Sequence, residues 1–212
     1  MLIEVKINLK LIMEGLCSMG NILGISGYSG SGKTTLLSKI IPELKAMGYT
    51  IGVIKHAQHI DMGSRDSDKF YTSGADKIIV SAPDVILKIS RQARERHLNE
   101  LINEMCSSSD IVFVEGYKGA RIPKIIVYRK GNIQTLKMIE DEDVVAIAVE
   151  RIDTIYDIKT VYPETEILNE GDTYCLKVKK RKVPVLNFNE TKKIVSFISR
   201  FLKLDFPGND MC

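Results

Sequence analysis

The chain has 212 residues, of which 44% are hydrophobic and 27% are charged, a balance typical of one soluble globular domain with a sizeable core. The formal net charge of +3 is too small to favour a nucleic-acid-binding protein. The four cysteines are scattered without a C-x-x-C pair, which argues against a zinc knuckle, a redox motif or a disulfide framework.

The N-terminus lacks the apolar stretch of a signal peptide, because charged residues interrupt it. No apolar run reaches the length of a membrane span. These features lead us to expect a cytoplasmic protein that does not contact a membrane.

Predicted strands and helices alternate along most of the chain. Residues 3–11 alternate apolar and polar side chains, as a half-buried strand does, unless the true start is Met13 or Met19 and this extension is incidental. Further strands are predicted at 22–26, 51–54, 77–81, 85–89, 111–114, 125–128, 144–149 and 183–186. Helices are predicted at 33–47, 66–73, 95–105 and 194–202, with a kink at Pro42 in the first. This alternation predicts an α/β fold with a mostly parallel, twisted sheet flanked by helices.

The expected domain organisation is simple. Residues 21–204 would form the main domain, residues 1–20 an N-terminal extension with a candidate edge strand, and residues 205–212 a tail. The stretch 154–182 is the least regular part and is a candidate inserted hairpin. Its basic run at 177–182 is either a patch for an anionic partner or, as we favour, a solvated face balanced by the acids before it.

A phosphate-binding loop is the strongest signal in the sequence. The segment GYSGSGKT fits G-x-x-x-x-G-K-[ST], with an apolar strand before it and an amphipathic helix after it. Glycines let several backbone N–H groups point inward at an anion, and the helix N-terminus adds its positive dipole end. Lys33 would neutralise the β- and γ-phosphates, and the Thr34 hydroxyl would bind Mg²⁺. The expected nucleotide-binding residues are Gly27, Ser29, Gly30, Ser31, Gly32, Lys33, Thr34 and Thr35. We therefore expect a three-layer P-loop NTPase fold rather than an incidental glycine-rich turn.

A second candidate follows the apolar run 111–114, where Glu115 ends a predicted strand. P-loop proteins supply an acid near the metal at such a position, and ligands of open α/β sheets gather at the carboxyl ends of strands. Glu115 is therefore a candidate catalytic and metal-binding residue, reaching the metal through a water because glutamate is longer than the usual aspartate. Gly116 would permit close approach of the backbone and contribute to nucleotide binding. The alternative is a carboxylate at the solvent boundary.

A polar block, KHAQHIDMGSRDSD, follows the predicted strand 51–54. If that strand neighbours the strand before the phosphate loop, Asp61 and Asp66 would hold Mg²⁺ or position water, and Lys55 or Arg65 would meet phosphate oxygens. His56, His59 and Asp61 would need further ligands to form a transition-metal site. We interpret the histidines as phosphate-site or structural residues.

Four segments together resemble the molybdopterin-guanine dinucleotide biosynthesis protein B (MobB) family. They are GYSGSGKTTL, VIKHAQHIDMGSRDSDKFYTSGA, DIVFVEGYKGARIPKIIVYR and VPVLNFNETKKIVSFI, in order between residues 21 and 202. The resemblance implies a dimeric, GTP-binding accessory protein of molybdenum (or tungsten) cofactor synthesis that hydrolyses GTP weakly with Mg²⁺. It also implies as partners the molybdopterin guanylyltransferase, which attaches GMP to molybdopterin, and molybdopterin itself.

The residues that match the family's motifs fall in three groups. They are residues 27–35, then Lys55, His56, His59, Asp61, Asp66 and Ser67, and finally Glu115, Gly116, Tyr117 and Lys118. The chain departs from the family's pattern in two features that concern recognition of the guanine base. Val149 and Glu150 stand where the family suggests an aspartate, and no N-K-x-D signature occurs. Guanine specificity therefore rests on the resemblance alone.

The residues also leave two alternative functions open. A P-loop kinase for a small molecule would need an arginine-rich lid, for which Arg91, Arg94 and Arg96 are candidates. A metallochaperone GTPase would need a tract rich in cysteine or histidine, and the sequence lacks one.

Overall fold

A computed structural model describes residues 21–58, 60, 65–171 and 173–204. The strand predicted at 3–11 and the tail at 205–212 lie outside the described residues. Contacts divide the chain into two compact units, one formed by Met1–His56 and Leu101–Cys212 and the other by Ala57–Glu100.

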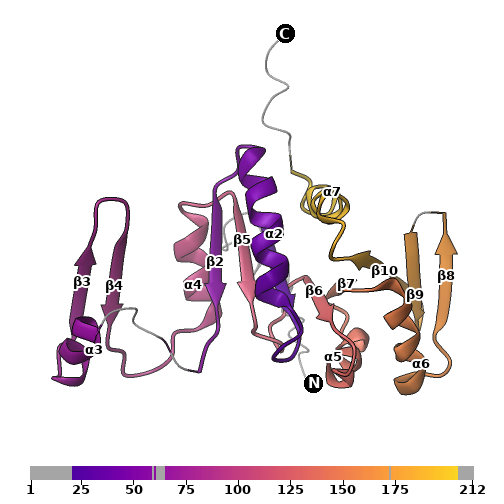
Figure 1. Ribbon diagram of the computed structural model, residues 1–212, viewed down its shortest axis with the longest axis horizontal. Helices are drawn as coiled ribbons and strands as arrows, with labels where there is room; N and C mark the ends of the chain where they lie inside the picture. The colour runs from indigo at the N-terminus through magenta and orange to yellow at the C-terminus, as the bar shows by residue number, and fades with distance from the viewer. Residues whose placement is uncertain (1–20, 59, 61–64, 172, 205–212) are drawn as a thin grey trace, which may run out of the picture. The chain divides into compact units, whose positions relative to one another are not determined.

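The first unit is built on an eight-stranded sheet with the order β2-β5-β1-β6-β7-β10-β9-β8 (Figure 1). The six strands from β2 to β10 run parallel, and β9 and β8 continue the sheet as an antiparallel hairpin. The strands are β1 (Ile22–Ser26), β2 (Ile51–Lys55), β5 (Ile111–Glu115), β6 (Lys124–Tyr128), β7 (Val144–Val149), β8 (Glu166–Glu170), β9 (Thr173–Val178) and β10 (Arg181–Asn187). The predicted mostly parallel sheet is confirmed.

Helices cover both faces of this sheet. They are α2 (Lys33–Ala46), α4 (Leu98–Cys106), α5 (Ile133–Leu136), η2 (Lys137–Glu140), η3 (Ile152–Asp157), α6 (Ile158–Val161) and α7 (Thr191–Leu202). Apolar residues of α2 and α7 pack on one face, and those of α5, η2, η3 and α6 pack on the other. Since β1, β5 and β6 are buried along their whole length, they read as continuous apolar runs in the sequence. The three-layer α/β prediction is confirmed.

Helix α2 continues through Pro42 and ends at Ala46. Proline removes the hydrogen bond to the carbonyl of Ser38, and Ser38 lies at an exposed position where water can replace it. Gly48 follows with a φ of 95°, a left-handed conformation that glycine adopts readily just after a helix ends. Helix α4 begins at Leu98 rather than at residue 95.

The basic run at 177–182 is balanced by acids, as we favoured from the sequence. Lys177 of β9 pairs with Glu166 of β8 at 2.6 Å, and Lys182 of β10 pairs with Glu170 of β8. Lys179 lies 3.5 Å from Glu140. These exposed pairs add little stability, but they leave no block of unopposed positive charge on this face.

The second unit contains an antiparallel hairpin of β3 (Lys77–Ser81) and β4 (Ile86–Ser90), preceded by α3 (Arg65–Thr72). Both the strand pair and the short helix were predicted. Within this unit the Arg91 guanidinium lies over the Tyr71 ring at 4.0 Å.

No helix in the described part of the chain is long and apolar enough to cross a membrane.

A buried lysine holds the connection between β5 and β6. This connection, residues 116–123, must cross β1, which lies between the two strands in the sheet. The Lys124 side chain is only 1% exposed, and its Nζ donates to the carbonyl oxygens of Lys118 at 3.3 Å and Ala120 at 2.6 Å. Its third partner is Asp141 Oδ2 at 2.8 Å. Three oxygens thus compensate the buried ammonium group and fix the path of the loop.

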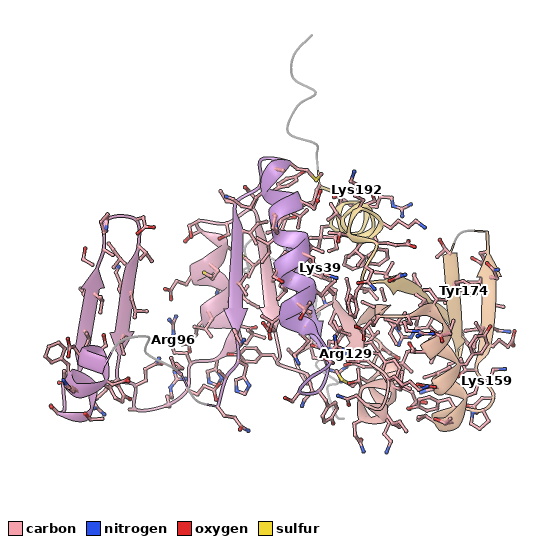
Figure 2. All side chains as sticks on the ribbon, in the orientation of Figure 1. Lys39, Arg96, Arg129, Lys159, Tyr174 and Lys192 are labelled. Carbon is pink, nitrogen blue, oxygen red and sulfur yellow. The ribbon has the colours of Figure 1, made fainter. Side chains whose placement is uncertain are left out.

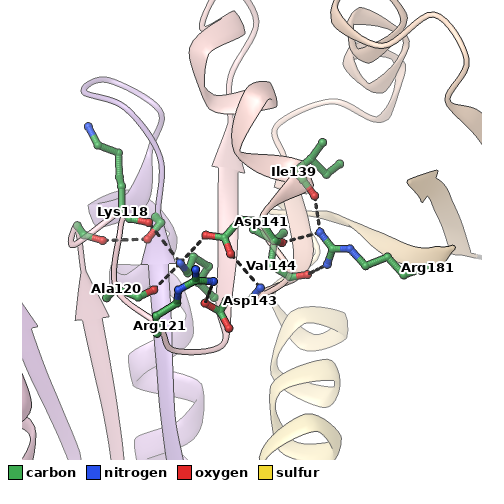
Figure 3. Close-up of polar contacts among 11 residues, drawn as sticks. Lys118, Ala120, Arg121, Ile139, Asp141, Asp143, Val144 and Arg181 are labelled. Atoms are coloured by element: carbon green, nitrogen blue, oxygen red, sulfur yellow. Dashed lines mark hydrogen bonds and ion pairs between the residues drawn. The ribbon is translucent and has the colours of Figure 1, made fainter. Parts of the chain in front are cut away.

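A second cation continues this network (Figure 3). The Arg181 guanidinium, which comes from β10, donates to the carbonyl oxygens of Ile139, Asp141 and Val144. It thereby holds the turn that carries Asp141. The crossover loop, the turn before β7 and strand β10 are therefore linked through Lys124 and Arg181.

Replacing Lys124 tests how much this cluster stabilises the fold. We expect Lys124→Met to lower the free energy of unfolding by about 3 kcal/mol, because Asp141 and two carbonyl oxygens lose their donor. Urea unfolding followed by circular dichroism measures the change. The matched control is Lys179→Met, which removes an exposed pair and should cost less than about 1 kcal/mol.

A sharper test is the pH dependence of the difference in unfolding free energy between the wild type and Lys124→Met. Burial alone would raise the pKa of Asp141, but hydrogen bonds from Lys124 and the Asp143 amide hold it below its ordinary value of 3.8. The carboxylate therefore contributes its full stabilisation above pH 3.8, and this is lost as the pH falls through the lower pKa of the folded state. The stability gap between the wild type and Lys124→Met should shrink below that pH, and a gap that is independent of pH would contradict this account.

Candidate functional site

The loop between β1 and α2 has the backbone shape that the phosphate-loop motif predicts. Gly27, Gly30 and Gly32 all adopt positive φ angles, of 146°, 75° and 96°. A Cβ on Gly27 would lie 2.7 Å from Ser31 Oγ and 2.8 Å from the carbonyl oxygen of Val127, so only glycine fits there. A Cβ on Gly30 would meet nothing within 4 Å. Gly27 is thus required by the fold, whereas Gly30 lies on the open side of the loop.

The N-terminus of α2 is suited to an anion. The first backbone N–H groups of any helix lack intrahelical acceptors, and among the described residues no side chain caps this end. The first turn also carries no acidic residue. Ser31 Oγ is buried beneath the loop without a hydrogen-bond partner among the described atoms. Phosphate oxygens would complement these donors and the positive end of the helix dipole.

Glu115 lies beside this loop because of the sheet register. Strand β5 pairs with β1 so that Glu115 is opposite Ile25, two residues before the loop begins. The Thr34 hydroxyl donates to Glu115 Oε1 at 2.8 Å, and Lys55 Nζ is 3.7 Å from the same oxygen. The structure therefore brings together Thr34, Glu115 and Lys55, which three separate sequence patterns predict as site residues.

The strand that carries Lys55 does not neighbour the strand before the phosphate loop. The predicted role of the polar block assumed that contact, but β5 lies between β2 and β1. Because β2 is parallel to β5, its register still places Lys55 opposite Glu115, at the same edge of the sheet. Lys55 thus reaches the site through Glu115.

Lys33 bonds to the loop itself, with its Nζ donating to the Tyr28 carbonyl oxygen at 2.9 Å. Partial burial lowers the pKa of the Lys33 ammonium group below its ordinary value. Glu115 opposes this shift in pKa, and the positive charges of Lys118 and Lys55 add to it. Two further lysines thus lie near Lys33, and a bound anion would offset their positive charge.

Lys118 is a residue to which the sequence analysis gave no role. Its Nζ lies 3.9 Å from the centre of the Tyr28 ring in the phosphate loop. The only sequence signal was its place three residues after Glu115 in a family motif, because strand and helix patterns say nothing about where a loop side chain points.

Two aromatic rings lie where β2 and β5 end. The rings of His56 and Tyr117 are 4.9 Å apart, and the His56 amide donates to the Glu115 carbonyl oxygen at 3.0 Å. Gly116 has a φ of 93°, and a Cβ there would lie 3.2 Å from the Cβ of His56. The close approach predicted at Gly116 is thus an approach by His56.

The structure does not test the predicted roles of the remaining residues of the polar block. Asp61 and His59 lie outside the described residues, as does the side chain of Arg65. Asp66 belongs to the second unit, in α3, where it pairs with Lys69 at 3.3 Å. The catalytic and metal-binding roles of Asp61 and Asp66 stay predictions.

Two other sets of predicted residues can be placed. Arg94 and Arg96, the kinase-lid candidates, pair with Glu100 within the second unit at 3.2 and 3.5 Å. Within the described ranges, no group of three or more His, Cys, Asp or Glu residues is arranged to hold a metal ion.

A shallow pocket of about 520 Å³ adjoins the other side of the phosphate loop. It is lined by Ser29, Gly30 and residues 129–134. Asn132 Nδ2 donates to the Ser29 carbonyl oxygen at 3.2 Å. Arg129, which is labelled in Figure 2, pairs with Glu150 at 3.0 Å. Glu150, which stands where the family suggests an aspartate, is thus engaged by Arg129. The pocket leaves room beside the loop for the remainder of a nucleotide.

A larger cavity, of about 880 Å³, lies between α7 and strands β9 and β10. Its lining contains no residue of the phosphate loop. Volume alone therefore does not identify the candidate site, whereas the convergence of charged groups on the loop does.

The donor atoms at the site fit Mg²⁺. Thr34 Oγ1 and Glu115 Oε1 are a hydroxyl and a carboxylate oxygen 2.8 Å apart. Oxygen ligands of this kind suit a hard cation that keeps most of its waters and also binds substrate phosphates. Neither a thiol nor an imidazole takes part in this pair, so the donor set does not suit a softer metal.

Comparisons with known proteins agree on one family. The family model described as "Molybdopterin guanine dinucleotide synthesis protein B" (MobB) matches residues 22–150. The chain is 38% identical over 131 residues to the molybdopterin-guanine dinucleotide biosynthesis adapter protein of Haemophilus influenzae, covering 60% of this chain and 73% of that protein. It is 30% identical over 172 residues to a putative adapter protein of the same description from Methanocaldococcus jannaschii, covering 79% and 65%.

Solved structures agree at the level of the fold. The crystal structure of Bacillus subtilis MobB superposes with a TM-score of 0.63 at 21% identity, covering 87% of this chain and 99% of that one. A MobB homologue from Bacillus stearothermophilus gives a TM-score of 0.58 at 19% identity, with the same coverage. Since the family model spans more than half of the sequence, the chain belongs to the MobB family.

Proposed function

We propose that this chain is a GTP-binding adapter in molybdopterin guanine dinucleotide synthesis, with weak Mg²⁺-dependent GTP hydrolysis. The adapter role follows from relatives described as molybdopterin-guanine dinucleotide biosynthesis adapter proteins. The observation that carries the nucleotide role is the Thr34–Glu115 hydrogen bond, set between the phosphate loop and Lys55.

The phosphates would bind where donors and positive charge converge. Lys33 would exchange its bond to the Tyr28 carbonyl for phosphate oxygens, and the backbone N–H groups of residues 30–35 would hold the remaining ones. Gly30 supports this arrangement, since its open side leaves room for an oxygen to approach the backbone.

Thr34 and Glu115 would hold Mg²⁺ through their oxygens. When bound, the cation neutralises charge that develops on the phosphates. Glu115 already accepts a hydrogen bond from Thr34 and faces Lys55, so it is engaged as a ligand and charge partner rather than placed to take a proton from water. Hydrolysis without a positioned base is slow, in keeping with a weak GTPase.

The partners we propose come from the family. They are the molybdopterin guanylyltransferase that attaches GMP to molybdopterin, and molybdopterin itself. A tungsten cofactor would be served by the same chemistry. Adapter proteins act through such partners, so nucleotide binding would prepare this chain for them rather than supply the main reaction.

We further propose that the chain is a homodimer, joined through the hairpin of the second unit. Val80 and Leu87 are paired across β3 and β4 and are 38% and 42% exposed. On the opposite face, Ile79 and Ile86 are 69% and 60% exposed. A two-stranded hairpin with apolar side chains exposed on both faces is marginally stable alone, and a second copy would cover it.

Nucleotide preference is the first test of this proposal. We expect the wild type to bind GTP more tightly than ATP, and Lys33→Ala to weaken GTP binding by about a hundredfold, because two phosphates lose a charged donor. Isothermal titration calorimetry with Mg²⁺ measures both. The matched control is Lys45→Ala, at the other end of α2, which should leave the affinity unchanged. Tighter binding of ATP would overturn the guanine assignment, and binding of neither nucleotide would overturn the site.

The Glu115→Gln variant tests the metal role. The amide oxygen can still accept the Thr34 hydrogen bond, so the fold should persist, but the charge that attracts Mg²⁺ is gone. We expect the Mg²⁺ concentration needed for half-maximal hydrolysis to rise by about tenfold, while GTP binding without metal is unchanged or tighter. Glu140→Gln, in an exposed pair with Lys179, is the control. Unchanged Mg²⁺ dependence would exclude Glu115 as a ligand.

The same assay of Mg²⁺-dependent hydrolysis tests the predicted roles of the aspartates in the polar block. Asp61→Asn or Asp66→Asn should slow Mg²⁺-dependent hydrolysis more than it weakens GTP binding. Full activity in both variants would instead make this block a docking surface for the pterin or a partner protein.

The dimer is tested by placing charge on the hairpin. We expect Leu87→Lys to convert a dimer into a monomer in sedimentation velocity, because a buried lysine without a partner opposes association. Tyr156→Lys changes an equally conspicuous exposed apolar residue of the first unit and should leave the dimer intact. A wild type that sediments as a monomer would refute the proposal.

A further inference from the structure

Lys118 and Lys33 both contact Tyr28, but different parts of it. Lys33 Nζ donates to the Tyr28 carbonyl oxygen at 2.9 Å, whereas Lys118 Nζ lies 3.9 Å from the centre of the Tyr28 ring. Tyr28 is itself part of the phosphate loop and is 37% exposed. One residue of the loop thus keeps two ammonium groups beside the place where phosphates would bind.

The charges around this place do not balance. The positive charges of Lys55 and Lys118 both act on Lys33, and Glu115 is the acid that opposes them there. Three cations facing one carboxylate leave an excess of positive charge, which a phosphate group would neutralise.

The backbone beneath Lys118 is fixed while its side chain is exposed. Its carbonyl oxygen accepts a hydrogen bond from the buried Lys124, as does that of Ala120. Figure 3 shows the Lys118 side chain pointing away from this cluster. The ammonium group can therefore change partners without moving the loop. A cation over an exposed ring is held less strongly than one in a charge-assisted hydrogen bond to a phosphate.

We propose that Lys118 is a phosphate-binding residue, held on the Tyr28 ring and transferred to the terminal phosphate when a nucleoside triphosphate binds. Lys124 is the positioning residue that keeps its loop in place. Lys118 is on the loop that follows Glu115. Glu115 and Thr34 would hold the cation that binds the terminal phosphate, so this is the phosphate that Lys118 would contact. This inference rests on the proposed nucleotide site and adds a residue to it.

The test compares GTP with GDP. Lys118→Met keeps the chain length and removes the charge, and should weaken GTP binding by about tenfold but GDP binding by less than about threefold. Lys118→Arg should restore most of the loss. Lys45→Met, the same change at the far end of α2, should have no effect. Equal losses for GTP and GDP, or no loss for either, would overturn the role at the terminal phosphate.

A second variant separates this role from a structural one. If Lys118 served only to hold the loop against the Tyr28 ring, Tyr28→Leu would weaken GTP binding as much as Lys118→Met does. In our proposal Tyr28→Leu removes only the ring that the Lys118 ammonium group contacts before the nucleotide binds, so GTP binding stays the same or tightens. Equal losses in the two variants would overturn the proposal.

The positioning role of Lys124 predicts a lack of additivity. Lys124→Met should reduce GTP affinity, and adding Lys118→Met to it should cost little more, because the lysine is already misplaced. If Lys124→Met does not fold, Asp141→Asn replaces it, because this change weakens the ion pair that positions Lys124. Additive losses would exclude the link between the two lysines.

The outcome also distinguishes this inference from the proposed function. If the wild type binds GTP and Lys33→Ala abolishes binding, while Lys118→Met behaves as the wild type, only the inference fails. If the wild type binds no nucleotide, both fail together.

Discussion

The register between β1 and β5 is the constraint on which the site depends. It places Glu115 opposite Ile25, so that the acid stands beside the first turn of α2 and accepts the Thr34 hydroxyl. The register of β2 on β5 then brings Lys55 to the other side of the same carboxylate. A slip of one residue in the pairing of β1 and β5 would turn the Glu115 side chain to the opposite face, and a slip in the pairing of β2 and β5 would do the same to Lys55. The buried apolar runs of β1 and β5 resist such a slip, because both faces of the sheet are packed.

Buried charged side chains stabilise the loop that crosses β1. The loop after β5 passes over this strand without a helix, and its carbonyl groups need donors that neither helix nor sheet supplies. Lys124 provides them, and Asp141 and Arg181 complete the network. This rigid support lies directly beneath Lys118, whose side chain faces the phosphate loop. A supported backbone with an exposed ammonium group suits a residue that changes partners on ligand binding.

Sequence reasoning succeeded where one pattern dominates and failed where distant segments must meet. The phosphate loop, the strand 111–114 and the strand–helix alternation all carry local signals, and the structure confirms their elements. The assumption that β2 neighbours β1 was wrong, since strand order depends on the path of the crossover and leaves no mark on the strands themselves. Lys118 was overlooked for a related reason, because a loop side chain has no periodicity to reveal its direction.

The sequence by itself determined the class of the fold, the phosphate loop with Lys33 and Thr34, and a strand-end acid at Glu115. Each of these follows from apolar periodicity or from the backbone freedom of glycine, which act over a few residues. Only the tertiary structure decided that Glu115 accepts the Thr34 hydroxyl, that Lys55 reaches the same oxygen, and that a buried Lys124 supports the loop of Lys118. The physical reason is that the contacts of Glu115 join distant segments, 81 residues apart for Thr34, and depend on strand order and register rather than on local propensity.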